Sequence, residues 1–187
     1  TPGTIVATGT DVTVSDTITI TSATTPAVTV TSGAVTNTFT SGVATLTKYV
    51  RNVTTPMVGT GAPYGYGGNN YYLGGITAKP GEVLEYALVA TNTSSTGSVS
   101  AAVMTDALPT SYVTFRSGVY SGSTDVTYFV VGSPSASYLT AAADADAANY
   151  AAPTLTVNVG TGATNAAGGT IPASTSLLVL YQVTINP

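Results

Sequence analysis

Acidic residues are the first candidates for chemistry in this chain. Four of them could in principle pair as the two carboxyl groups of a glycosidase: Glu82, Glu85, Asp106 and Asp125. Nothing in the sequence alone puts two of them in one cleft. The chain also has no His and no Cys, which excludes Ser-His, Cys-His and His-metal sites. We therefore expect a protein that is not an enzyme.

Metal and cofactor sites have one weak candidate. The stretch "DADAAN" offers Asp144, Asp146 and Asn149 as oxygen ligands for Ca²⁺. It lacks the glycine and the distal bidentate glutamate of a complete calcium loop, so an ordinary solvated turn is favoured. We expect no cofactor.

Two asparagines lie in acceptor sequences for N-glycosylation. Asn52 begins "NVT" and Asn92 begins "NTS". Acceptor sequences often remain unused, so both residues are candidate sites whose use the sequence leaves open.

Composition narrows the class of protein. The 187 residues are 43% hydrophobic, enough for a real core, and carry four Lys+Arg against eight Asp+Glu. So few cations exclude nucleic acid and anionic membrane surfaces as natural partners, and no apolar run is long enough to span a bilayer. Low charge, abundant Thr, Ser and Gly, and a start at "TPGTIVATG" predict an extracellular, surface-located chain whose signal peptide has been removed.

Alternation with a period of two is the dominant pattern, and it predicts strands that are half buried. In "LEYALVATN" it directs Leu84, Tyr86, Leu88 and Ala90 inward. The same reading applies to Leu155, Val157 and Val159, and to Leu177, Val179, Tyr181, Val183 and Ile185. Turn signals between these runs predict an all-β antiparallel sandwich. Only residues 137–153, which are rich in Ala, could hold a short helix.

A Tyr- and Gly-rich insertion at 54–75 interrupts the strand pattern. Its four tyrosines are Tyr64, Tyr66, Tyr71 and Tyr72. One interpretation is an ordered surface loop packed by its own rings. The other is an interaction surface for a neighbouring subunit or a glycan, because tyrosine is enriched at interfaces.

From Leu46 onward the order of motifs resembles a known family. The matching residues are Pro80, Gly81, Glu82, Tyr86, Asn92, Asp106, Leu108 and Pro109, followed by a closing "GGTIPASTSLLVLYQVTI". They resemble the prokaryotic surface repeat called domain of unknown function eleven, the conserved repeat domain. The resemblance implies an immunoglobulin-like β-sandwich over residues 46–187, used as a building block of secreted, wall-associated or filamentous proteins. Residues 1–45 have no counterpart in the family.

The segment before the family-like region predicts a way to assemble. Residues 4–30 form a β-prone arm with two charges, and such an arm can add a strand to a neighbouring copy. The arm would bury the apolar residues on one face: Val12, Val14, Ile18 and Ile20. This hypothesis makes the protein a pilus- or fibre-like filament subunit whose partners are copies of itself. The alternative is that the arm supplies the first strands of its own sandwich.

Two further hypotheses stay open at this point. The chain could instead be a cell-surface adhesion module that presents the tyrosine loop at 64–72 to a glycan or protein. Immunoglobulin-like surface modules also sometimes join a lysine to Asn or Asp beside a buried acid. Lys48, with Asn92 or Asp106 and with Glu85, has the residue types for that bond, although a surface lysine whose stem covers apolar area is the simpler interpretation.

Overall fold

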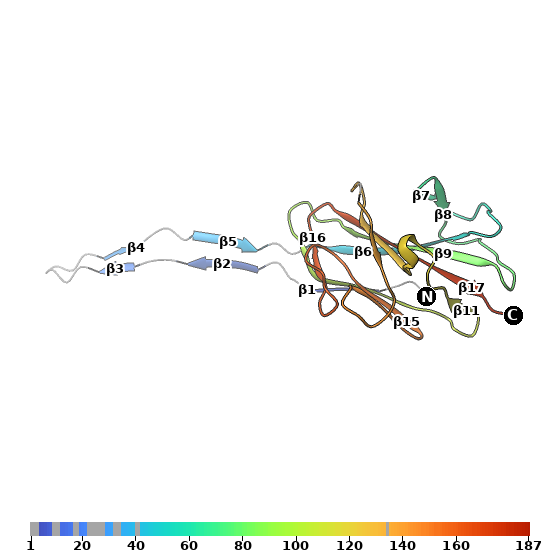
Figure 1. Cartoon of the computed structure of the whole chain (residues 1–187). Helices are drawn as coiled ribbons and strands as arrows, with labels where there is room; N and C mark the ends of the chain where they lie inside the picture. The colour runs from blue at the N-terminus through green and yellow to red at the C-terminus, as the bar shows by residue number, and fades with distance from the viewer. Residues whose placement is uncertain are drawn as a thin grey trace.

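The chain folds as an all-β antiparallel sandwich in a computed structural model. The structure describes residues 42–133 and 135–187 in full, together with the backbone of five strands before residue 42. Within this part of the chain there is no α-helix, and one short 3₁₀ turn, η1, spans Ser121–Ser123. The prediction of an all-β sandwich is confirmed (Figure 1).

The first sheet has five strands. Its main path runs β1 (Thr4–Thr8), β10 (Val99–Ala107), β15 (Thr154–Asn158) and β14 (Ala148–Ala151), and β16 (Gly169–Ile171) also pairs with β10. All of these pairs are antiparallel. Strand β1 therefore lies at one edge of the sheet and β14 at the other.

The second sheet has six strands. Its path runs β13 (Ser137–Leu139), β12 (Val126–Val130), β17 (Ser176–Ile185), β9 (Val83–Asn92) and β6 (Ala44–Asn52), and β11 (Val113–Phe115) also pairs with β17. Strand β9 is central, with β17 on one side and β6 on the other. Strand β6 is the edge strand of this sheet, as β1 is of the first sheet. The two edges lie on the same side of the sandwich, because β1 contacts β6 as well as β10.

The main core lies between the two sheets, where the alternating pattern predicted it. Leu88, Leu177 and Tyr181 from the second sheet meet Met104 and Leu155 from the first, and all five are fully buried or nearly so. Burying an aliphatic or aromatic side chain of this size contributes roughly 1.5–3 kcal/mol. The predicted inward residues of β9, β15 and β17 belong to this core, with Tyr86 and Ile185 at its margin.

A second apolar cluster lies on the outer face of the six-stranded sheet. Ala87, Val89, Leu178 and Leu180 point away from the main core and are still buried. The hairpin of β7 (Tyr64–Tyr66) and β8 (Asn69–Tyr71) packs over this face, at the top of the view in Figure 1. The insertion is therefore a third layer of the fold, and β9 and β17 are buried on both faces.

The Ala-rich segment 137–153 contains two strands instead of the helix that its composition permitted. Strand β13 pairs with β12, and β14 pairs with β15. Thr140, Asp144 and Asp146 hold the turn between them through short side-chain hydrogen bonds. The weak helix propensity of the alanines is overridden by pairing with the sheets on either side.

Four short strands precede β6 and pair among themselves. Strand β2 (Val12–Asp16) pairs with β5 (Val35–Phe39), and β3 (Thr19–Thr21) pairs with β4 (Thr29–Thr31). They form two-stranded sheets separate from the sandwich sheets, and Figure 1 shows these strands beyond one end of the sandwich. Of the strands in residues 1–41, β1 is the one that joins a sandwich sheet.

Candidate functional site

The most highly connected carboxylate of the structure is Glu85, on the outer face of β9. Its cross-strand neighbours are Arg51 on β6 and Gln182 on β17, so the register of three strands brings these side chains together. Oε2 accepts hydrogen bonds from Arg51 Nε at 2.7 Å and from Tyr71 Oη at 2.7 Å. Oε1 accepts from Tyr120 Oη at 2.8 Å and Gln182 Nε2 at 3.0 Å. Every strong acceptor direction of this carboxylate is therefore occupied.

The electrostatics of Glu85 are those of a structural anchor. Burial alone would raise the pKa of its carboxyl, but hydrogen bonds from Gln182 and Tyr71 and the charge of Arg51 lower it below the ordinary value. Burial, followed by the charge of Glu85, raises the pKa of Tyr71 and of Tyr120. A carboxylate kept ionised and fully bonded has no capacity to act as a general acid. The cluster instead fastens the β7–β8 layer to the sheet.

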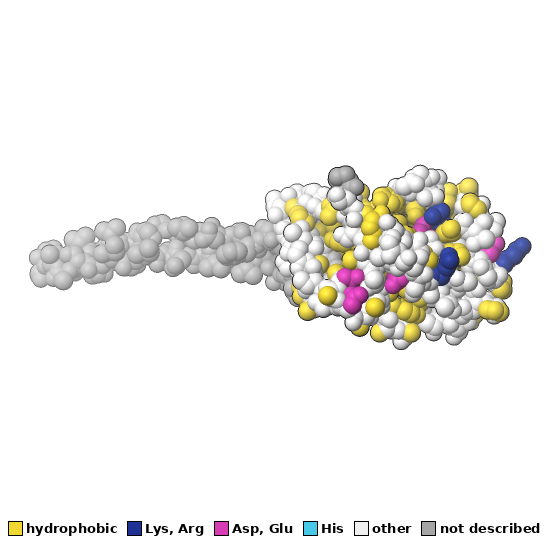
Figure 2. Space-filling model, viewed as in Figure 1, with side chains coloured by type: hydrophobic (Ala, Val, Ile, Leu, Met, Phe, Trp, Pro, Cys, Tyr) yellow, Lys and Arg dark blue, Asp and Glu magenta, His cyan; other side chains and the backbone are white. Residues whose placement is uncertain are grey.

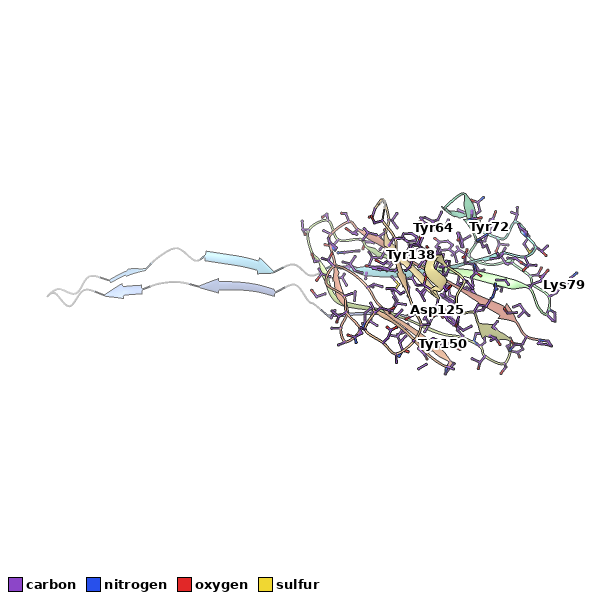
Figure 3. The ribbon with its side chains drawn as sticks, viewed as in Figure 1. Tyr64, Tyr72, Lys79, Asp125, Tyr138 and Tyr150 are labelled. Carbon is purple, nitrogen blue, oxygen red and sulfur yellow. The ribbon has the colours of Figure 1, made fainter. Side chains whose placement is uncertain are left out.

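Two of the four tyrosines of the insertion are buried. Tyr71 and Tyr72, which the sequence offers as candidate contact residues for a partner, are 1% and 6% exposed, so little of either side chain is accessible to one. Tyr64 stacks on Tyr49 at 5.3 Å, and Tyr66 stacks on Phe129 at 4.3 Å between ring centroids. Figure 3 labels Tyr64 and Tyr72 on the side of the sandwich where β7 and β8 lie. Tyr66 is the most exposed of the four, at 37%, and the loop covers the sheet because Tyr71 and Tyr64 pack into the outer apolar cluster.

A second buried ion pair links the two sheets. Lys48 on β6 points into the sandwich, and its Nζ lies 2.5 Å from Oδ2 of Asp106 on β10. Tyr181 Oη donates to the same carboxylate oxygen. The ammonium also lies 4.2 Å from the centre of the Tyr86 ring, a cation–π arrangement. Asp106 is 1% exposed, and its Oδ1 has no hydrogen-bond partner.

The residues suggested for a lysine cross-link are only partly brought together. Lys48 meets Asp106, but Glu85 lies on the opposite face of β9, bonded to Arg51, and Asn92 has its own partners. The acid that was expected to assist the reaction is therefore absent from the site because alternate residues of a strand face opposite ways. The sequence identifies these residue types, but it does not show on which face of the sheet each side chain lies.

The other candidate carboxylates also have structural partners. Glu82 accepts hydrogen bonds from Thr55, Asn52 and the backbone of Lys79, and the bond from Thr55, followed by the others, lowers its pKa to about 2. Asp125 accepts from the backbone nitrogens of residues 118 and 141. Because Glu85 and Asp106 face different layers, the paired arrangement of a glycosidase is not formed by those two.

The two glycosylation candidates are buried. Asn92 is fully buried, and its Nδ2 donates to the carbonyl oxygens of Gly97, Ile171 and Pro172 at 2.8–3.0 Å. Asn52 is 2% exposed, and its Nδ2 donates to Thr77 and Glu82. A glycan would occupy the nitrogen that makes these bonds. In the folded chain Asn52 and Asn92 therefore tie loops to strands, and a glycan on either nitrogen would have to displace these hydrogen bonds.

The calcium candidate is a turn. Asp144 Oδ1 accepts from the backbone of Asp146, and Asp146 Oδ1 accepts from the backbone of Ala148. Their other oxygens accept from Thr140. Both carboxylates thus stabilise the chain reversal between β13 and β14, and no group of three or more metal-ligating side chains occurs in the part of the chain that is described.

Strand β1 forms one edge of the five-stranded sheet. Strand β1 pairs with β10 in the register Thr4↔Thr105, Ile5↔Met104 and Val6↔Val103. Directly opposed residues of an antiparallel pair point to the same face, so the position of Ile5 is on the core side with the fully buried Met104. Val6 is at an outward position.

A depression continues from the end of this strand pair. It has a volume of about 430 Å³ and lies between the two sheets, with Leu46, Val50 and Tyr86 on one side and Ala107 and Pro109 on the other. Beside it, the β6 backbone at Val50 is paired with Tyr72 in both directions. The backbone N–H and C=O groups of Ala44, Leu46 and Lys48 point away from β9, as those of Val50 do. This part of the β6 edge therefore directs its peptide groups toward the gap that β1 enters.

The fold therefore defines an antiparallel β-sandwich with a third layer and an N-terminal edge strand. Comparison with family models, with curated proteins and with solved structures finds no match. The resemblance to the conserved repeat domain accordingly stays a prediction. Among the described residues, no helix is long and apolar enough to cross a membrane.

Proposed function

We propose that the protein is an extracellular structural protein that assembles with copies of itself into a pilus- or fibre-like filament joined by strand donation. The observation that supports this most directly is the β1–β10 pair. The N-terminal segment completes the edge of the sandwich, while the strands that follow it pair only among themselves. The edge strand is thus linked to the sandwich through strands that do not pair with the sandwich sheets. A sheet edge of this kind can accept the equivalent strand of another copy.

The chemistry of the described residues is consistent with a building block. Its buried charged and amide side chains are fixed in bonds that join layers, as the Lys48–Asp106 pair, the Glu85 cluster and Asn92 show. Charged side chains are few on the face seen in Figure 2, where apolar and neutral polar atoms cover most of the surface. Such a surface repels neighbouring copies weakly, which favours close packing along a filament.

The adhesion hypothesis has a narrower basis. A depression of about 320 Å³ beside the insertion is lined by Arg51, Asn69, Asn70 and Tyr72 among others, and polar side chains of these types bind sugars. The tyrosine rings themselves pack against the sheet, however, as described above. We therefore rank a binding module second. Loss of glycan or protein binding in an Asn70→Ala variant would support it.

Electron microscopy and sedimentation of the pure full-length chain test the proposed function. We expect filaments that form without any added protein, nucleic acid or membrane. Particles that stay monodisperse at high concentration and across a range of salt concentrations would overturn the proposal, because strand donation needs only a second copy.

A further inference from the structure

Strand donation requires one particular donor strand, and its assignment to β1 rests on the proposed function. We propose that β1, residues 4–8, is the donated strand and that the edge of β10 is the acceptor, so that β1 of one copy occupies this edge in the next. The sequence predicts that the arm is donated through four apolar residues: Val12, Val14, Ile18 and Ile20. The structure instead pairs β2 with β5 and β3 with β4 of the same chain, and Ile18 lies outside the described residues.

The register of β1 on β10 gives the exchange its specificity. Ile5 is opposite Met104, on the side of the core, and Met104 and Ala102 are both fully buried with β1 in place. A strand shifted by one residue would turn Ile5 outward and Thr4 or Val6 inward. An incoming β1 from another copy makes the same pairs, so exchange loses no contact of the sandwich.

The connection between β1 and β6 permits exchange. The pairs β2–β5 and β3–β4 are short, and isolated two-stranded sheets are only marginally stable in water. If they separate, the chain from Thr8 to Ala44 spans roughly 120 Å when extended at about 3.3 Å per residue. A sandwich of this size is on the order of 40 Å across, so β1 can reach the β10 edge of a neighbouring copy.

The geometry also predicts the type of assembly. Each copy has one β1 to donate and one β10 edge to accept it. Donor and acceptor are different surfaces, so the contact is head-to-tail and continues from copy to copy unless the rotation closes a ring. The depression that continues past Thr105 along β6 lies next to this contact and offers apolar side chains to residues near the incoming strand.

Engineered disulfides test the exchange cleanly because the chain has no cysteine of its own. Thr4→Cys and Thr105→Cys place two thiols at directly opposed positions. Each thiol is placed in a separate variant, and one of the two variants carries a size tag. The two variants are mixed, unfolded and reassembled. The disulfides that form under mild oxidation are then identified on a non-reducing gel. We expect a mixed disulfide between Thr4→Cys and Thr105→Cys chains in the filaments. Thr4→Cys mixed with Ser100→Cys is the register control, because Ser100 is opposite Thr8, and we expect little cross-linking.

The variant with both cysteines separates the outcomes. Exchange predicts a ladder of covalently linked chains. Filaments whose double variant gives only a disulfide within each chain would overturn the exchange of β1 and leave the proposed function standing. A chain that forms no filaments overturns the proposed function and the exchange together.

A second set of variants tests the face of the strand. Ile5→Asp puts a charge at the inward position, and we expect at least a tenfold loss of filament mass. Val6→Asp is the matched control at the outward position next to it and keeps assembly. Val14→Asp with Ile18→Asp also keeps assembly, because donation runs through β1. Equal assembly of the Ile5 and Val6 variants, or loss of filaments only in the Val14 and Ile18 variant, would refute β1 as the donor.

Discussion

Removal of the Lys48 ammonium is the sharpest test of how the two sheets are held together. Lys48→Met keeps most of the length and the apolar character of the stem but deletes the charge that lies over the Tyr86 ring. Asp106 is then left 1% exposed, with Oδ1 unbonded and Oδ2 bonded only by Tyr181. Removing one partner of a buried ion pair, so that the other charge stays buried and unpaired, lowers the free energy of unfolding by about 3–5 kcal/mol. That is a large share of the roughly 5–15 kcal/mol by which domains are stable.

The double variant gives the comparison that isolates the charge. Lys48→Met with Asp106→Leu replaces both partners by apolar side chains, which is often neutral or even stabilising. We therefore expect the double variant to be more stable than Lys48→Met alone by at least about 2 kcal/mol. The reason is that desolvation of the lone carboxylate, more than the lost attraction, sets the cost.

Urea unfolding followed by tyrosine fluorescence measures both variants, since the chain has 12 Tyr and no Trp. With a slope of about 2 kcal/mol per molar urea, Lys48→Met should lower the midpoint by roughly 1.5–2.5 M. A loss below about 1 kcal/mol would mean that the carboxylate finds water or another donor. A double variant as unstable as the single one would mean that the stem packing of Lys48, not its charge, matters.

Two further predictions follow from the buried polar groups. The melting temperature, measured by circular dichroism, should be nearly constant between about pH 5 and 9. The pKa values of Glu82 and Glu85 are lowered in the fold, so these carboxylates stabilise it above about pH 4.5 and lose that effect as the pH falls; the pKa values of Tyr71, Tyr120 and Tyr181 are raised, so these phenols stabilise it below pH 10.0 and lose that effect as the pH rises. A steep change of the melting temperature inside the window would contradict this assignment. Asn92→Ala should cost about 2–4 kcal/mol in urea unfolding because it leaves buried carbonyl groups at Gly97 and Ile171 without their donor, and an effect no larger than that of the exposed control Asn70→Ala would refute it.

The sandwich was predictable from the sequence because its main signal is local. Alternation in β9, β15 and β17 directs every second residue to the core, and the core contains the residues that this pattern selected. The same segments also carried an unused signal. "LEYALVA" and "LLVLY" have apolar residues at the intervening positions as well, and a nearly continuous apolar run is typical of a strand buried on both faces. That signal predicts a covering layer, which the insertion supplies.

The polar clusters could not be derived from the sequence because they depend on register and parity across distant strands. Arg51 and Gln182 meet Glu85 only because β6 and β17 flank β9 in one particular alignment. Lys48 meets Asp106 because both point into the gap between sheets, while Glu85, one strand position from Tyr86, points out. Residue types identified the participants, but a shift of one residue in any strand would have chosen different partners.

The distribution of these clusters bears on where the sandwich can exchange a strand. The Lys48–Asp106 pair joins β6 to β10, Asn92 joins β9 to the carbonyl of Ile171 on β16, and the hydroxyl of Tyr128 on β12 accepts the backbone N–H of Gly160. The first two ties connect the two sheets, the third connects the second sheet to the loop between β15 and β16, and all three are made within residues 42–187. Removing β1 from the edge of β10 would break none of them. These ties would hold the layers together while that edge is open, which the proposed exchange of β1 requires of an acceptor.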